Sequence, residues 1–129
     1  MPPQLNSDEN LCRFVTKKKQ ISEAHIDPAL FMLRDGEAYL SMWLDDGRPL
    51  KDRWAAGEKL LKNKCFGSAD IIAKHLKTLP KCNLSSELTN ETNRHVAIRG
   101  LPPRFKNEAL QIAQELVTIA TPVLNKEEV

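Results

Sequence analysis

The stretch from Thr92 to Ala120 constrains the fold of this chain more than any other, because two kinds of hydrophobic pattern follow each other within it. A short apolar segment suited to a strand comes first, a Gly-Pro-Pro break follows, and a segment with helical spacing of its apolar residues completes it. We predict a strand over Asn93 to Ile98 and a helix over about Asn107 to Ala120. The chain is therefore expected to fold as an α+β protein.

The predicted last helix is apolar around most of its circumference. Apart from Gln114, its polar residues stand three or four positions apart and form one narrow stripe: Glu108, Gln111, Glu115 and Thr118. An ordinary surface helix has an apolar arc only a little over 100° wide. We therefore expect this helix to be flanked on more than one side.

The segment from Glu37 to Leu44 predicts a strand with two largely apolar faces. Alternation places Tyr39 and Trp43 on one face and the apolar side chains of residues 38, 40, 42 and 44 on the other. A strand of this kind is covered on both sides, either by its own chain or by another one. Tyr39 and Trp43 are thus candidates for a partner interface. The alternative is core burial under the N-terminal segment.

Shorter signals complete the expected fold. Residues 11–16 predict a strand, and residues 49–63 predict a helix with Pro49 in its first turn. Ser68 is suited to cap a second helix over 69–79, although residues 65–72 fit a strand, a helix or both in succession. Residues 81–91 are polar and predict an exposed loop. Together these elements predict a small sheet of three to five strands with two or three helices packed on one face.

The length of 129 residues predicts one folded domain. We expect residues 1–10 to form a flexible N-terminal leader, residues 11–124 a single α+β domain, and residues 125–129 a loose acidic C-terminus. No apolar run approaches the roughly 20 residues that span a bilayer. Cys12, Cys65 and Cys82 are widely spaced and odd in number, which favours reduced thiols and a cytoplasmic location.

Several kinds of chemical site lack their sequence signature. The cysteines and histidines include no closely spaced pair of zinc ligands. Gly100 is isolated and is followed by two prolines, so neither a Walker loop nor a dinucleotide-binding loop is present. Cys12 and Cys65 have apolar neighbours, and burial makes a thiol unreactive. We predict no metal site and no cofactor, and we assign no catalytic residue.

The predicted strand at residues 93–98 offers the strongest candidate for a binding site. Alternation places His95 and Arg99 on one face around the small Ala97, which leaves a shallow notch suited to a carboxylate or phosphate. Arg104, beyond the prolines, and Arg13, on the first strand, could add positive charge. The alternative is that His95 hydrogen-bonds a neighbouring strand or loop while Arg99 is solvated.

Lysines are concentrated in the middle of the chain. Five of them stand between residues 62 and 81 against one acidic residue: Lys62, Lys64, Lys74, Lys77 and Lys81. Contacts to nucleic-acid phosphates need only positive charge, so these lysines are candidates for non-specific nucleic-acid binding. The alternative is a set of solvated lysines, since the formal net charge is only +2.

These observations lead to one preferred hypothesis for function and two alternatives. Because no catalytic set is recognisable and apolar residues are in excess, we expect a protein-interaction module. Such a module would be an accessory or regulatory subunit of a larger assembly, or would bind a second copy of itself. The first alternative is an enzyme or ligand-binding domain that recognises a phosphorylated or carboxylated molecule through His95 and Arg99. The second is nucleic-acid binding through the lysines of residues 62–81.

Overall fold

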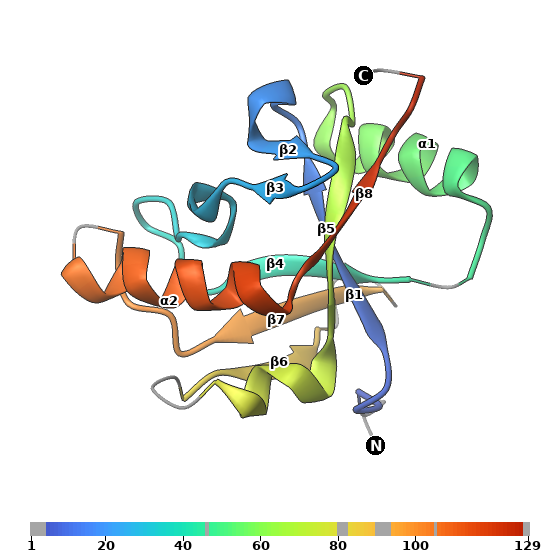
Figure 1. The fold of residues 1–129 in the computed structure, drawn as a ribbon. Coiled ribbons are helices and arrows are strands. Elements are labelled where there is room, and N and C mark those ends of the chain that lie inside the picture. The colour runs from blue at the N-terminus through green and yellow to red at the C-terminus, as the bar shows by residue number, and fades with distance from the viewer. Residues whose placement is uncertain (1–4, 46, 80–82, 90–93, 105, 128–129) are drawn as a thin grey trace.

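The computed structural model describes residues 5–45, 47–79, 83–89, 94–104 and 106–127 (Figure 1). The strands are β1 (Asn10–Val15), β2 (Ile21–Ser22), β3 (His25–Ile26), β4 (Leu40–Leu44), β5 (Gly67–Ile72), β6 (Ser85–Leu88), β7 (His95–Arg99) and β8 (Thr121–Leu124). The helices are α1 (Leu50–Leu61), α2 (Asn107–Ile119) and the short 3₁₀ helices η1 (Lys18–Gln20), η2 (Pro28–Phe31) and η3 (Ala73–Thr78).

Six of the described strands form one antiparallel sheet in the order β6-β7-β4-β1-β5-β8, and β2 and β3 form a separate hairpin. β1 lies near the centre, so strands from both halves of the chain flank it. The edge strand β8 contains Pro122, which has no N–H to donate and is tolerated at a sheet edge.

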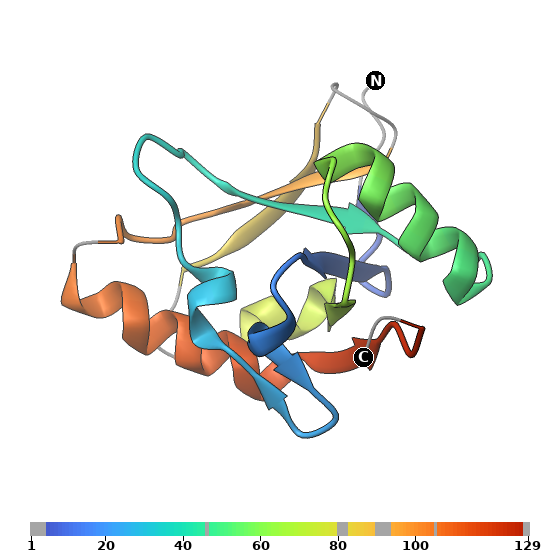
Figure 2. The ribbon, with the colours of Figure 1, turned by 90° about the horizontal axis from the view of Figure 1, so that it is seen from above.

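Helices cover both faces of this sheet (Figures 1 and 2). Neighbouring residues of a strand point to opposite faces, so Met42 and Trp43 mark the two sides of β4. Met42 belongs to the main core, which includes Leu116 of α2 and residues of the 3₁₀ helices. Trp43 packs in a smaller cluster with Trp54 of α1. The fold therefore has three layers, with α1 on one side of the sheet and α2 on the other.

The α+β class was predicted, but two details of the fold prediction were wrong. The sheet has six strands in the described part of the chain, not three to five. The helices lie on both faces, not on one, because α1 and α2 pack against opposite sides of β4. The two helices themselves, predicted over residues 49–63 and 107–120, are confirmed with similar bounds.

The predicted helix over residues 69–79 was wrong in its first half. Residues 67–72 form β5, which pairs with β1 on one side and with β8 on the other. Only residues 73–78 are helical, as the 3₁₀ helix η3. The Ser68 hydroxyl donates to Asp70 Oδ1 and caps no helix. Pairing on both sides outweighed the local helical signal, as tertiary context commonly does.

Two other segments also form strands. Within the expected loop of residues 81–91, residues 85–88 form β6 and pair with β7; residues 81–82 and 90–91 lie outside the described residues. Residues 121–124 form β8 beyond α2. None of the helices in the described ranges is long and apolar enough to span a membrane.

The ends of the predicted domain make contacts with its body. Residues 1–4 and 128–129 lie outside the described residues. Ahead of β1, the backbone carbonyls of Ser7 and Glu9 accept hydrogen bonds from η3. After β8, the buried Asn125 donates from its side-chain amide to the carbonyl of Cys65. The chain is thus hydrogen-bonded to η3 ahead of residue 11 and to the segment before β5 after residue 124.

Candidate functional site

A gap opens between β1 and β4 at the middle of the sheet. β1 pairs with β5 over its full length, but it pairs with β4 only at Leu11–Leu44 and Cys12–Trp43. Beyond these pairs the Arg13 side chain bridges the two strands. Its Nη1 donates to the Ser41 carbonyl of β4 at 2.8 Å, and its Nε donates to the Leu30 carbonyl of η2 at 3.1 Å. A guanidinium therefore stands where backbone pairing stops.

A polar cavity of about 300 Å³ lies at this gap. Among the described residues that line it, four side chains are cationic and Glu37 supplies the one carboxylate; the cations are Arg13, Lys17, Arg34 and Arg104. The Glu37 carboxylate also accepts a hydrogen bond from the Arg34 backbone N–H. Within this described lining, cationic groups thus outnumber carboxylates four to one, and this imbalance favours an anion there.

Arg13 is the most constrained of these cations. Its pKa is lowered to about 10, chiefly by burial; the nearby Glu37 opposes this shift and Arg34 adds to it. The group is still protonated at neutral pH. Its Nε and Nη1 are bound to carbonyls, whereas Nη2 has no hydrogen-bond partner among the residues that the structure describes. A bound anion would offset part of the cost of burying this charge.

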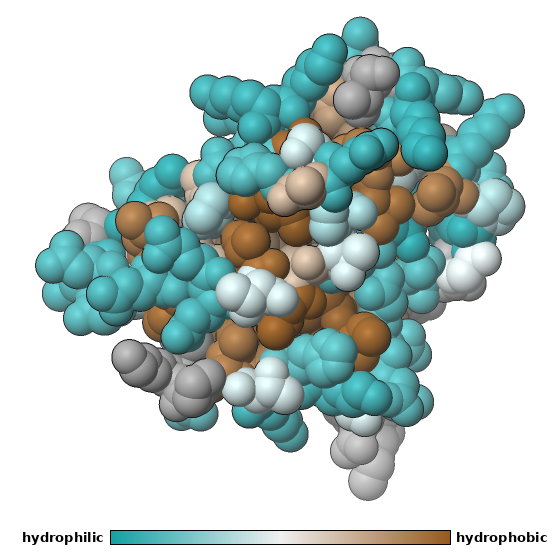
Figure 3. Space-filling model, viewed as in Figure 1, coloured by the Kyte–Doolittle hydropathy of each residue, from teal (hydrophilic) through white to brown (hydrophobic). Residues whose placement is uncertain are grey.

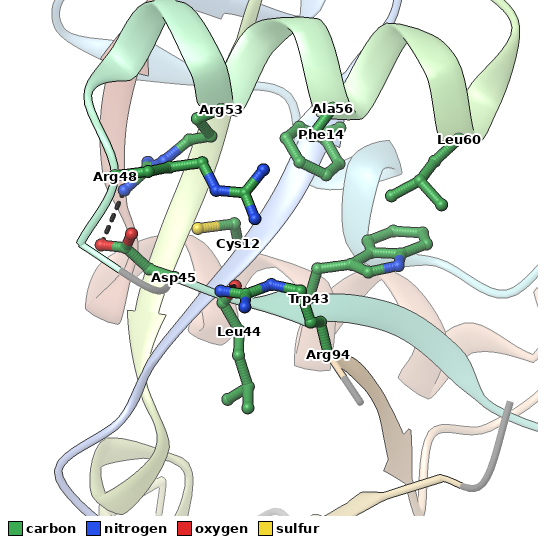
Figure 4. A pocket seen from close by; sticks show the side chains of 10 residues that line it. All are labelled: Cys12, Phe14, Trp43, Leu44, Asp45, Arg48, Arg53, Ala56, Leu60 and Arg94. Atoms are coloured by element: carbon green, nitrogen blue, oxygen red, sulfur yellow. Dashed lines mark hydrogen bonds and ion pairs between the residues drawn. The ribbon is translucent and has the colours of Figure 1, made fainter. Parts of the chain in front are cut away.

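A second, mainly apolar cavity of about 130 Å³ lies between α1 and the sheet (Figure 4). Phe14, Trp43 and Leu60 supply much of its apolar wall. Arg48 and Arg94 reach toward the Cys12 thiol from opposite sides of the cavity. The cavity thus combines aromatic rings with cations.

A buried ionic network forms one end of this cavity and ties α1 to the sheet. Arg53 of α1 contacts Asp45 at 2.8 Å, just beyond β4, and Asp70 of β5 at 2.9 Å. Asn10 of β1 donates to Asp70 at 2.9 Å. Within the described parts of the chain, the buried Arg53 Nε has no hydrogen-bond partner. Because both carboxylates are directly paired with the guanidinium, we assign this network a structural role.

The two described cysteines are held as thiols. Burial raises the pKa of Cys12 far above its ordinary value, and the neighbouring Asp70 raises it further. Burial also raises the pKa of Cys65, whose Sγ donates to the Gly67 carbonyl. Neither group is therefore available as a thiolate nucleophile near neutral pH. Cys82 lies outside the described residues.

The structure separates the four anion-binding candidates into two pairs. Arg13 and Arg104 line the polar cavity, whereas His95 and Arg99 line neither cavity. The His95 ring is buried, with Nδ1 at 2.8 Å from Thr89 Oγ1 and Nε2 at 2.8 Å from Ser41 Oγ. Arg99 forms an ion pair with Glu87 on the neighbouring strand. The notch expected around Ala97 is filled, since Ala97 is fully buried.

The partner-interface candidates Tyr39 and Trp43 are both half-buried within their own chain. Their rings meet the His95 imidazole edge-on, with ring centroids 5.8 and 5.5 Å away. Trp43 also packs against Phe14 at 5.5 Å. Tyr39, just before β4, and Trp43, within it, thus flank the same histidine.

The lysine candidates do not form one patch. Lys62 and Lys64 follow α1, whereas Lys74 and Lys77 belong to η3, and β5 runs between the two pairs. Six extended residues span about 20 Å. Lys74 forms an exposed ion pair with Asp8, and Lys81 lies outside the described residues.

Over the described ranges, no group of three or more His, Cys, Asp or Glu side chains is placed to hold a metal ion. No protein-family model, curated protein or solved structure matches this chain.

Sequence reasoning missed Arg34 of the polar cavity and the whole Arg53 network. The Asp35-Gly36 turn marks Arg34 as a loop residue but does not show what it faces. For Arg53 a signal was present. It lies one helical turn before Gly57, on the face of α1 that includes Trp54, so its position predicts an inward-facing charge.

Proposed function

We propose that this protein binds a phosphorylated or carboxylated molecule in the polar cavity at the gap between β1 and β4. The observation that carries the proposal is the convergence of Arg13, Arg34 and Arg104 on one cavity whose lining, in the part of the chain that the structure describes, includes a single carboxylate. Arg13 and Arg104 are two of the four residues that the sequence indicated for an anion. Arginine suits this role because its planar fork matches carboxylate and phosphate oxygens.

Calorimetric titration with pyrophosphate and with citrate tests the proposal. Arg34→Gln removes a cation that is exposed and close to a turn, so the fold should tolerate it. Because a charge-assisted hydrogen bond contributes about 1.5–3 kcal/mol, we expect the affinity to fall about tenfold or more. Arg99→Gln is the matched control, since Arg99 lies outside the cavity, and it should leave the affinity unchanged. Loss of binding in Arg99→Gln but not in Arg34→Gln would contradict the proposal.

A second candidate function is association with another protein subunit, starting with a second copy of this chain. Apolar side chains gather on one face where α2 meets β8 (Figure 3). Ile119, Ala120 and Leu124 are half-buried there, and Leu110 of α2 is 47% exposed. Light scattering measures the molar mass directly. A mass of twice 14.6 kDa that returns to 14.6 kDa in Ile119→Lys would support this candidate, and a monomer at all concentrations would contradict self-association.

A further inference from the structure

The polar and apolar cavities share a wall of two aromatic rings. Phe14 and Trp43 line both cavities, and their ring centroids lie 5.5 Å apart. Trp43 is only half-buried, although its ring borders both spaces. A ligand that leaves the polar cavity on this side therefore meets the indole first.

Cations stand on both sides of this wall. Arg13 and Arg34 lie in the polar cavity, and Arg48 and Arg94 lie in the apolar one. Figure 4 shows Arg48 and Arg94 reaching toward Cys12, with Trp43 farther along the same cavity. A molecule with two anionic groups, one on each side of the indole, would meet a guanidinium at both ends.

A second aromatic–cation pair continues along the same strand face. Tyr39 comes just before β4, four residues ahead of Trp43. The Arg99 guanidinium lies over the Tyr39 ring, 5.1 Å from its centre. Tyr39 and Trp43 both contact His95, so they lie on one side of the sheet. This side thus carries two aromatic rings beside His95, one of them under a guanidinium.

Resting on the proposed function, we propose that the anion recognised in the polar cavity is a backbone phosphate of single-stranded nucleic acid, and that a base of the same strand stacks on Trp43. Proteins that bind single strands combine a cationic groove for the backbone with aromatic rings for the bases. The arrangement around Trp43 supplies both. This site does not include the lysine candidates of residues 62–81, whose described members follow α1 or belong to η3.

An acidic peptide is the main competing polyanion. It would satisfy the cations equally well, but its acidic side chains offer no planar ring to the partly exposed indole. Stacking of a base on an aromatic side chain contributes about 1–3 kcal/mol. The tryptophan between two groups of arginines therefore favours nucleic acid over an acidic protein.

The two tryptophans make the test specific. Trp54 lies on the buried face of α1 and is only 6% exposed, so Trp54→Phe leaves Trp43 as the reporter of stacking. We expect an oligothymidylate of about eight nucleotides to quench Trp43 fluorescence saturably, and pyrophosphate to bind without such quenching. Anisotropy of a labelled oligonucleotide with the wild-type chain gives the affinity independently of that variant. Arg94→Gln should weaken oligonucleotide binding severalfold and leave pyrophosphate binding unchanged.

The outcomes separate this inference from the proposed function. The inference alone would be overturned by two results together. Pyrophosphate would bind in a way that depends on Arg34, and the oligonucleotide would bind no more tightly than pyrophosphate and leave Trp43 emission unchanged. Absence of saturable binding by both probes would overturn both proposals. Polyglutamate that binds as tightly as the oligonucleotide would also count against nucleic acid. Trp43→Leu, with its fold checked by circular dichroism, should weaken oligonucleotide binding about tenfold or more and spare pyrophosphate binding.

Discussion

Gly57 of α1 lies so close to the ring of Phe14 that a Cβ at this position would stand 2.7 Å from Phe14 Cδ1. The helix backbone thus packs directly on an aromatic side chain of β1. This contact accounts for a glycine in the middle of a helix, where it costs about 1 kcal/mol relative to alanine. It also places α1 over the Phe14–Trp43 wall between the two cavities.

Gly57→Ala should destabilise the protein, although alanine is the better helix former. Overpacking in a core costs about 1–3 kcal/mol, which exceeds the gain in helix propensity. Urea unfolding measures the change. Ala55→Gly, at an exposed position of the same helix, is the matched control and should cost about 1 kcal/mol through propensity alone. A stabilised Gly57→Ala variant would show that α1 does not pack on Phe14.

Arg53→Met should cost about 3–5 kcal/mol of the free energy of unfolding, because it leaves two partly or fully buried carboxylates without their cation. Arg53→Lys should be intermediate, since an ammonium lacks the planar fork that reaches both Asp45 and Asp70. Lys51→Met, at an exposed position of α1, should stay within about 0.5 kcal/mol of the wild type. Equal stability of the Arg53→Met and Lys51→Met variants would refute the structural role of the network.

The Asp45 carboxylate should make part of the stability dependent on pH. Its burial raises the pKa, but the Gly47 N–H and Arg53 outweigh that effect and hold it below the ordinary 3.8. A carboxylate with a lower pKa in the folded state stabilises the fold above its unfolded pKa, and this stabilisation disappears as the pH falls through the folded pKa. We expect the stability difference between wild type and Asp45→Asn to be largest near neutral pH and to shrink below about pH 4. Contributions common to both proteins cancel in this difference. A difference in the free energy of unfolding that grows as the pH falls would therefore contradict the prediction.

Cys12 and Cys65 should resist thiol reagents in the folded protein. Burial raises the pKa of both groups, and Cys12 is 2% exposed and Cys65 fully buried. In a Cys82→Ser background, an aromatic disulfide reagent at pH 8 should label neither thiol until denaturant is added. Fast labelling of the native variant would show that α1 opens over the sheet.

The parts of the fold that follow from local sequence were predictable. α1 and α2 have the bounds that their helical periodicity and prolines indicate, since a helix satisfies its backbone within one segment. β5 was not predictable in this way. Residues 67–72 favour a strand only because β1 and β8 supply hydrogen-bond partners from positions far away in sequence.

The candidate site divides along the same line. The residue types that suit an anion, Arg13 and Arg104 among them, could be read from the sequence. Their grouping with Arg34 could not, because it depends on where β1 and β4 stop pairing. For His95 the sequence left open a ligand-facing role or a hydrogen bond to a neighbouring strand or loop. Its partners could not be named, because only the folded sheet brings Ser41 and Thr89 beside it.

The most direct test of the anion-binding account is nuclear magnetic resonance of the arginine side chains during a titration with pyrophosphate. The Nε–H signals of Arg13 and Arg34 should shift together and saturate, while the Arg99 signal stays in place. A saturable shift at Arg99 with none at Arg13, or small linear shifts at all three, would contradict binding in the cavity between β1 and β4.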